Sequence, residues 1–152
     1  MMGQLAQAAL GNGGEVIGVI PKGLHERNVA FNGLTDLRVV GSMHERKALM
    51  AELSDGFMAL PGGLGTLEEI FEIVTWAQLG MHQKPCGLLN VVGYFTPLLA
   101  FLDQVTEQGF LDAPHRAMIL SAEEPEELLR QFECYNPIVA DKAEWALGLG
   151  KK

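Results

Sequence analysis

The chain has 152 residues, of which 48% are hydrophobic and 20% are charged, which fits a folded domain and excludes a disordered chain. Its formal net charge of −8 at pH 7 offers no basic surface for a polyanion, so we expect no nucleic-acid partner. The two cysteines form no CxxC pair, residues 1–14 lack the basic region and apolar core of a signal peptide, and no apolar run is long enough to cross a bilayer. These features favour a cytoplasmic protein without a membrane partner. The four histidines lack ligand spacing, so we expect no metal site.

Short apolar runs alternate with segments in which apolar residues recur every three or four positions. The runs predict strands at 16–20, 37–40, 57–60, 86–90 and 117–120, and the segments predict helices at 42–53, 66–79, 94–107 and 123–132. Strand and helix in alternation predict parallel pairing. The expected fold is therefore α/β, a Rossmann-like doubly wound parallel sheet with helices on both faces.

The first segment, residues 2–14, is helix-like and runs directly into the first predicted strand. Doubly wound folds commonly open with a strand and a phosphate-binding turn, so we expect the first βα element to be missing. Residues 1–133 are predicted to form one nucleotide-binding catalytic domain, and residues 134–152 a C-terminal extension. The polar connection 21–35 has a length that is typical of functional loops.

Two predicted helices begin with the S/T-x-x-E pattern of a capping box, formed by Ser42 with Glu45 and by Thr66 with Glu69. Both helices follow a strand directly. In an open α/β sheet these junctions lie at the carboxyl ends of the strands, where ligands bind and helix N-termini attract anions. We therefore expect the chemistry at residues 41–47 and 61–69.

The second junction reads PGGLGTLEE and resembles a phosphate-binding loop by its position. Its glycines Gly62, Gly63 and Gly65 would let the backbone turn tightly and approach a ligand, while the amides of the next helix face an anion. The spacing is neither GxGxxG nor GxxxxGK[ST], so it indicates neither a dinucleotide nor a P-loop triphosphate. The alternative is a glycine-rich turn followed by a helix cap.

The first junction places Arg46 and Lys47 near a helix N-terminus, where the macrodipole disfavours cations and an anionic partner is expected. The alternative is a solvated pair balanced by Glu45. An arginine at one strand end and a glutamate at the next would face a shared crevice. This arrangement suits N-glycosidic cleavage, in which a carboxylate such as Glu69 stabilises the positive charge on the sugar. Glu68 and Glu69 point about 100° apart, so one is expected to be catalytic and the other to bind or cap.

The motifs MHERKALM and PGGLGTLEE, with IPKGL, TWAQLG and KPCGLLNVVGY, resemble the LONELY GUY family of cytokinin riboside 5′-monophosphate phosphoribohydrolases, long mislabelled as lysine decarboxylases. The most specific part is PGGxGTxxE with the upstream Arg-Lys pair. The resemblance extends from Met2 to about Phe132. It implies a hydrolase that cleaves N6-substituted AMP to a free base, the cytokinin, and ribose 5-phosphate. It also implies a Rossmann-like fold, no cofactor, and a homodimer or higher homo-oligomer.

Carried over by position, the resemblance makes Arg46 and Glu69 the catalytic pair. It implies substrate binding by Met43, Lys47, Gly62, Gly63, Leu64, Gly65, Thr66, Glu68 and Thr75. Within that set, residues 62–66 would cradle the 5′-phosphate, Lys47 would anchor the substrate and Glu68 would sit at the ribose. Trp76 and Leu79 are candidates for the dimer interface or the base pocket, with a plain core face as the alternative.

Two alternative functions use the same residues. In the first, the loop holds a nucleotide or a phosphorylated cofactor without cleaving it. In the second, the enzyme is a general nucleosidase for AMP or other nucleotides, because the sequence does not determine the base. An amino-acid decarboxylase is discarded, since no lysine here has the setting of a pyridoxal phosphate Schiff base.

Overall fold

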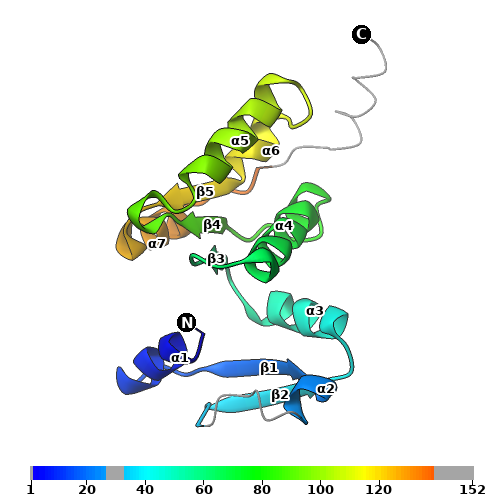
Figure 1. Cartoon of the computed structure of the whole chain (residues 1–152), viewed down its shortest axis with the longest axis vertical. Helices are drawn as coiled ribbons and strands as arrows, with labels where there is room; N and C mark the ends of the chain where they lie inside the picture. The colour runs from blue at the N-terminus through cyan, green and yellow to red at the C-terminus, as the bar shows by residue number, and fades with distance from the viewer. Residues whose placement is uncertain (1, 27–32, 139–152) are drawn as a thin grey trace. The chain divides into compact units, whose positions relative to one another are not determined.

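The computed structural model describes residues 2–26 and 33–138, drawn in colour in Figure 1. The chain divides into two compact units, Met1–Ser54 and Asp55–Lys152. Each unit contains parallel strands flanked by helices. The predicted α/β class is therefore confirmed. Of the predicted C-terminal extension, residues 134–138 are described and residues 139–152 lie outside the described part of the chain. The domain boundary at 133 stays a prediction.

The first unit is built on two parallel strands. Its elements are α1 (Met2–Gly11), β1 (Ile17–Pro21), α2 (Lys22–His25), β2 (Asp36–Val40) and α3 (Met43–Leu53). The register pairs Ile17 with Asp36 and Pro21 with Val40. Gly18 allows close packing here, because a Cβ on it would lie 3.2 Å from the Cδ1 of Leu37. Both α2 and α3 contact this sheet.

The second unit is built on a three-stranded parallel sheet in the order β3-β4-β5 (Figure 1). Its elements are β3 (Phe57–Ala59), α4 (Leu64–Gln78), β4 (Cys86–Leu89), the 3₁₀ helix η1 (Val91–Gly93), α5 (Thr96–Glu107), α6 (Ala113–Ala117), β5 (Ile119–Ala122) and α7 (Pro125–Glu133). All four residues of β4 are buried, as expected for a central strand that is covered on both faces.

Helices cover both faces of this sheet. Leu88 on one face of β4 lines an apolar hollow together with Val74 of α4 and Leu102 of α5. On the other face, a Cβ on Gly87 would lie 2.8 Å from both Leu128 and Phe132 of α7. Glycine at this position therefore lets α7 approach the strand closely. The predicted three-layer arrangement is confirmed within the second unit.

The predicted strands and the four predicted helices are present, with shifted ends. The predicted strand 117–120 starts two residues later, at Ile119, because α6 occupies residues up to Ala117. The polar connection 21–35 begins with α2, and its residues 27–32 lie outside the described part of the chain. Both cysteines are free, Cys86 buried and Cys134 exposed. Burial raises the pKa of the Cys86 thiol from 9.0 to about 12.

Candidate active site

The first unit contributes the N-terminus of α3, which is closed by its own side chains. Ser42 is the N-cap, and its Oγ accepts a hydrogen bond of 3.1 Å from the Glu45 amide. The Glu45 carboxylate accepts a bond of 2.8 Å from the amide of Gly41, the residue before the cap. The predicted Ser42–Glu45 capping box is therefore confirmed, with its carboxylate one residue further back than the standard box. This helix end already holds a negative charge.

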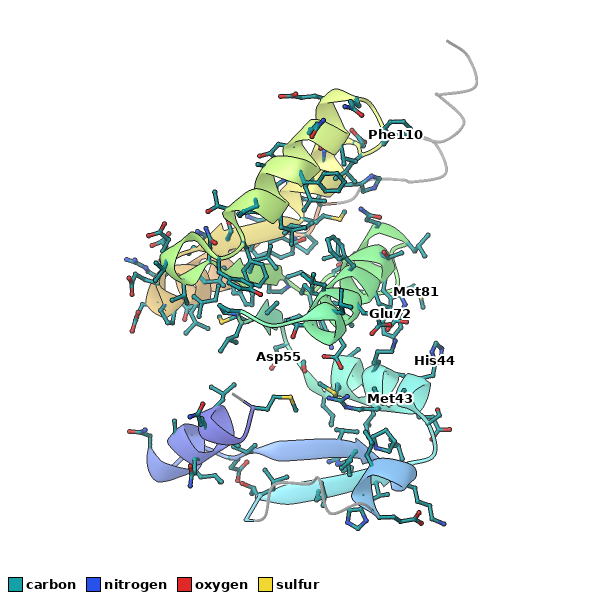
Figure 2. All side chains as sticks on the ribbon, viewed as in Figure 1. Met43, His44, Asp55, Glu72, Met81 and Phe110 are labelled. Atoms are coloured by element: carbon teal, nitrogen blue, oxygen red, sulfur yellow. The ribbon has the colours of Figure 1, made fainter. Side chains whose placement is uncertain are left out.

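The predicted cations follow directly on the same helix. The amide of Arg46 donates to the Ser42 carbonyl at 3.1 Å, which is the first hydrogen bond of the helix. The side chains of Arg46 and Lys47 are half-buried. Met43, predicted to bind substrate, is 44% exposed at the first helical position (Figure 2). The structure thus places all three predicted residues of this junction on the first two turns of α3.

The second unit contributes the glycine-rich loop and α4. This helix begins at Leu64 with Gly63 as its N-cap, and no side chain makes a cap hydrogen bond. The predicted Thr66–Glu69 capping box is therefore wrong, as is the helix start at Thr66. Thr66 is the third residue inside the helix, since the glycine cap starts the helix two residues earlier than the pattern indicated.

The three glycines of this loop have different surroundings. A Cβ on Gly62 would lie 2.9 Å from the Cβ of Thr66 and would also collide with its Oγ1. A Cβ on Gly63 or Gly65 would meet nothing within 4 Å. Gly63 has a φ of −90°, which other residues also adopt. Gly62 is therefore needed for packing, whereas Gly63 and Gly65 leave open space beside the helix terminus.

That open terminus presents backbone donors. The first hydrogen bond of α4 runs from the Leu67 amide to the Gly63 carbonyl at 3.2 Å. The amides of Leu64, Gly65 and Thr66 precede it, so they have no acceptor within the helix. The first turn of α4 carries no acidic residue. The positive end of the helix dipole is therefore available to an anion at this junction.

The predicted carboxylates lie on the next turns of α4. Glu68 is exposed and Glu69 is half-buried. Glu72, shown in Figure 2, and Thr75 follow Glu68 at intervals of four and seven, so these three share one side of the helix. The Thr75 hydroxyl donates to the Phe71 carbonyl at 2.7 Å, which leaves its oxygen able to accept a bond. Glu69 lies on the neighbouring side.

A residue that sequence reasoning did not assign also contacts the loop. The hydroxyl of Tyr94 donates to the Gly62 carbonyl at 2.8 Å, across 32 residues of sequence. Tyr94 follows η1 in the turn after β4, and the loop follows β3, so both lie at the carboxyl edge of the same sheet. The sequence signals were its place in a turn after a strand and its position at the end of the motif KPCGLLNVVGY, to which no role was assigned.

Two hollows in the second unit lie away from this loop. One contains about 390 Å³ of empty space beside the end of α4 and is lined by residues that include His82 and Tyr135. The other, about 200 Å³, is apolar and lies among α4, β4, α5 and β5. Neither is lined by the glycine-rich loop, whose donors are on an open surface of the unit.

Among the described residues, no group of three or more His, Cys, Asp or Glu side chains could hold a metal ion. In that same part of the chain, no helix combines the length and the apolar composition needed to cross a membrane. The structure brings the predicted residues together within each unit, with Met43, Arg46 and Lys47 on α3 and the loop, Glu68, Glu69 and Thr75 on α4. The pairing of Arg46 with Glu69 stays a prediction.

Residues 2–132 match the family model described as possible lysine decarboxylase. The chain is 48% identical over 150 residues to cytokinin riboside 5′-monophosphate phosphoribohydrolase LOG1 of Arabidopsis thaliana, covering 97% of this chain and 70% of that protein. It is 49% identical over 150 residues to LOG4 of the same plant, with the same coverage of 97% and 70%. It is 51% identical over 138 residues to the probable phosphoribohydrolase LOGL9 of Oryza sativa, covering 91% of this chain and 61% of that protein.

Proposed function

The chain belongs to the family of cytokinin riboside 5′-monophosphate phosphoribohydrolases, and we propose that it hydrolyses the N-glycosidic bond of an N6-substituted adenosine 5′-monophosphate. The products are the free base, a cytokinin, and ribose 5-phosphate. The relatives are named as phosphoribohydrolases, whereas the description of the family model names a different activity, possible lysine decarboxylase. We propose hydrolysis because the identity of 48% and 49% to those relatives extends over 97% of this chain.

The observation that carries the proposal is the uncapped start of α4. A nucleoside monophosphate has a dianionic phosphate, and this terminus offers three amides without helical acceptors, no acidic residue, and open space at Gly63 and Gly65. The start of α3 is occupied by the Glu45 carboxylate. In the proposed complex the 5′-phosphate therefore binds at residues 62–66.

The reaction then needs a group that stabilises positive charge on the sugar. Glu69 lies on the turn after the phosphate loop, and its carboxylate would stabilise the oxocarbenium-like transition state and orient the attacking water. Water adds to C1′, the C1′–N9 bond breaks, and the base leaves with a proton. Glu68 and Thr75 would contact the ribose side of the substrate. Arg46 would be the catalytic partner of Glu69, while Lys47 and Met43 bind substrate.

The proposal is tested by chromatographic detection of free base from AMP and from N6-isopentenyl-AMP. Glu69→Gln keeps the size of the side chain but removes its charge, so we expect base release to fall by about 10²- to 10³-fold. Arg46→Ala should cause a loss of the same order. Matched controls are Glu133→Gln and Arg130→Ala on α7, where the exposed Arg130 pairs with the half-buried Glu127.

Unchanged base release by Glu69→Gln would contradict the assigned role of that carboxylate. AMP binding by the unaltered chain without any base release would select the alternative, a nucleotide-binding protein. Equal rates on AMP and on N6-isopentenyl-AMP would select a general nucleosidase. The two substrates must therefore be compared on the same preparation.

The proposal includes a cytoplasmic homodimer or higher homo-oligomer. Both cysteines are free, which agrees with a reducing compartment. Leu79, predicted as an interface or base-pocket residue, is 58% exposed at the end of α4, and Met81 beside it is 66% exposed. Trp76 is half-buried. An interface between copies would cover these apolar side chains, and light scattering would measure the assembly.

A further inference from the structure

We propose that Tyr94 is a positioning residue, which fixes the orientation of the glycine-rich loop so that its amides face the phosphate of the substrate. This inference rests on the proposed function, since it assigns a role in phosphate binding. Tyr94 itself contacts the loop and not the substrate. Its hydroxyl donates to the Gly62 carbonyl at 2.8 Å, and this hydrogen bond is the contact through which it would act.

The peptide geometry explains why holding a carbonyl directs an amide. The peptide unit is planar, and the described chain contains no cis peptide bond. The Gly62 carbonyl and the Gly63 N–H therefore point in opposite directions across the same peptide plane. When Tyr94 holds the carbonyl, the Gly63 N–H is directed away from Tyr94. Gly63 is also the N-cap of α4, so the same bond sets how the chain enters the helix.

Tyr94 is itself held by a fixed turn after β4. The backbone amide of Asn90 donates to the Ala122 carbonyl of β5 at 2.7 Å. The side-chain Oδ1 of Asn90 accepts a hydrogen bond of 2.6 Å from the Phe95 backbone amide. Its Nδ2 donates to Thr96 Oγ1 at 3.1 Å. The Phe95 side chain is 1% exposed and contacts the Tyr94 ring edge-on, with centroids 5.0 Å apart. The hydroxyl of Tyr94 thus extends from an anchored backbone.

The same turn contains a strained residue. Val92 has φ 51° and ψ 33°, a left-handed conformation that β-branched residues rarely adopt, and its side chain is 96% exposed. Gly93, next to it, has φ 71°. An exposed valine gains little from packing, so its own contacts do not explain the strain. A turn that keeps an unfavourable conformation while carrying Tyr94 to the loop agrees with a functional constraint.

The test compares Tyr94→Phe with Tyr135→Phe in the full chain. These are the two tyrosines of the sequence, and each substitution removes one hydroxyl. Tyr135 lies after α7 and lines the hollow that includes His82. The readouts are KM and kcat for N6-isopentenyl-AMP, the inhibition constants of ribose 5-phosphate and adenine, direct binding of inorganic phosphate by calorimetry, and Tm.

For Tyr94→Phe, we expect three values to rise about three- to tenfold: KM, the inhibition constant of ribose 5-phosphate, and the dissociation constant of inorganic phosphate. This is the range that one net hydrogen bond gives. The adenine constant should not change, because adenine has no phosphate. Tyr135→Phe should leave all of these constants unchanged. A merely structural tyrosine would lower Tm without this phosphate-specific loss, and that result would overturn the proposal.

The two proposals fail in different ways. In one case, the unaltered chain releases base and Tyr94→Phe binds phosphate as tightly as the unaltered chain. This result would overturn the role of Tyr94 and would still support the proposed hydrolase. Phosphate binding that depends on Tyr94, without any base release, would overturn the hydrolase and keep the role of Tyr94 in the loop. An unaltered chain that neither binds phosphate nor releases base would overturn both.

Discussion

Helices α3 and α4 begin at equivalent places, directly after a parallel strand, yet their first turns are built in opposite ways. In α3, Ser42 and Glu45 cap the helix, and no residue of the helix is buried. In α4, no side chain caps the helix, and Ile70, Ile73 and Val74 are buried. The first helix is therefore stabilised at its end, and the second along its body.

The difference shows which helix can bind an anion without losing its own stability. A cap satisfies the free amides of a first turn, so a capped terminus has few donors left for a ligand. Because α4 is stabilised by its buried residues, its terminal amides can remain open. The helix with the buried face is therefore the one that we expect to hold the phosphate.

The same contrast extends to the two units. Among the described residues of the first unit, Ala6 and Pro21 are the buried ones. The second unit contains the largest fully buried side chains, Phe95, Leu88, Leu128 and His115. We therefore expect most of the free energy of unfolding to come from the second unit.

The largest effect should come from Leu128→Ala, a substitution in the core of the second unit. Leu128 is 0% exposed and packs over Gly87 of β4. Truncation leaves a cavity, so the free energy of unfolding should fall by about 2–5 kcal/mol, measured by urea denaturation. The matched substitution in the first unit is Leu37→Ala on β2, where the leucine is 37% exposed. Its cost should be below about 1 kcal/mol, and an equal cost for the two variants would break the comparison.

A smaller effect on the free energy of unfolding should distinguish two glycines of the loop, Gly62 and Gly65. Gly62→Ala places a Cβ 2.9 Å from the Thr66 Cβ, so we expect a loss of about 1–3 kcal/mol in the free energy of unfolding. Gly65→Ala lies in open space inside the helix and should cost no stability, since alanine favours helix.

Both variants are compared by urea denaturation and by calorimetric binding of inorganic phosphate. The Cβ added at Gly65 enters the space beside the open amides, so phosphate binding should weaken although the fold is kept. Full phosphate affinity in Gly65→Ala would indicate that the anion does not approach this side of the helix terminus.

The smallest effect should come from the cap of α3. Ser42→Ala removes the hydroxyl that accepts the Glu45 amide, so α3 should lose about 1 kcal/mol. Hydrogen exchange of the α3 amides measures this loss. The control is Ser54→Ala at the other end of the same helix, where the hydroxyl donates to the Met50 carbonyl at 2.7 Å. Exchange of the α3 amides in Ser42→Ala at the rate of the unaltered chain would mean that the N-terminal cap does not stabilise α3.

The sequence predicted the parallel α/β architecture because its strands have a continuous apolar pattern that any covered strand needs. Residues 86–89 illustrate this, since every residue of β4 is buried. The capping pattern was less dependable. The same four-residue pattern marks a real cap at Ser42 but not at Thr66, because Gly63 starts α4 earlier and moves Thr66 into the helix. A local pattern does not fix its own position relative to the helix start.

Features that depend on contacts between distant segments were not predicted. The bond from Tyr94 to Gly62 joins two turns that are 32 residues apart and meet only because their strands are neighbours in the sheet. The short helices α2 and α6 were also missed. With four and five residues, they are too short to show a helical apolar period. The catalytic roles of Arg46 and Glu69 stay predictions, which Arg46→Ala and Glu69→Gln test.

The contrast between the two cysteines has a practical consequence for labelling. The buried Cys86 thiol, with its pKa raised to about 12, carries almost no thiolate at neutral pH, and thiolate is the form that reacts. Cys134 is exposed at the end of α7. A maleimide dye added to the folded protein would therefore attach at Cys134, which provides a fluorescent reporter on the second unit without any engineered cysteine.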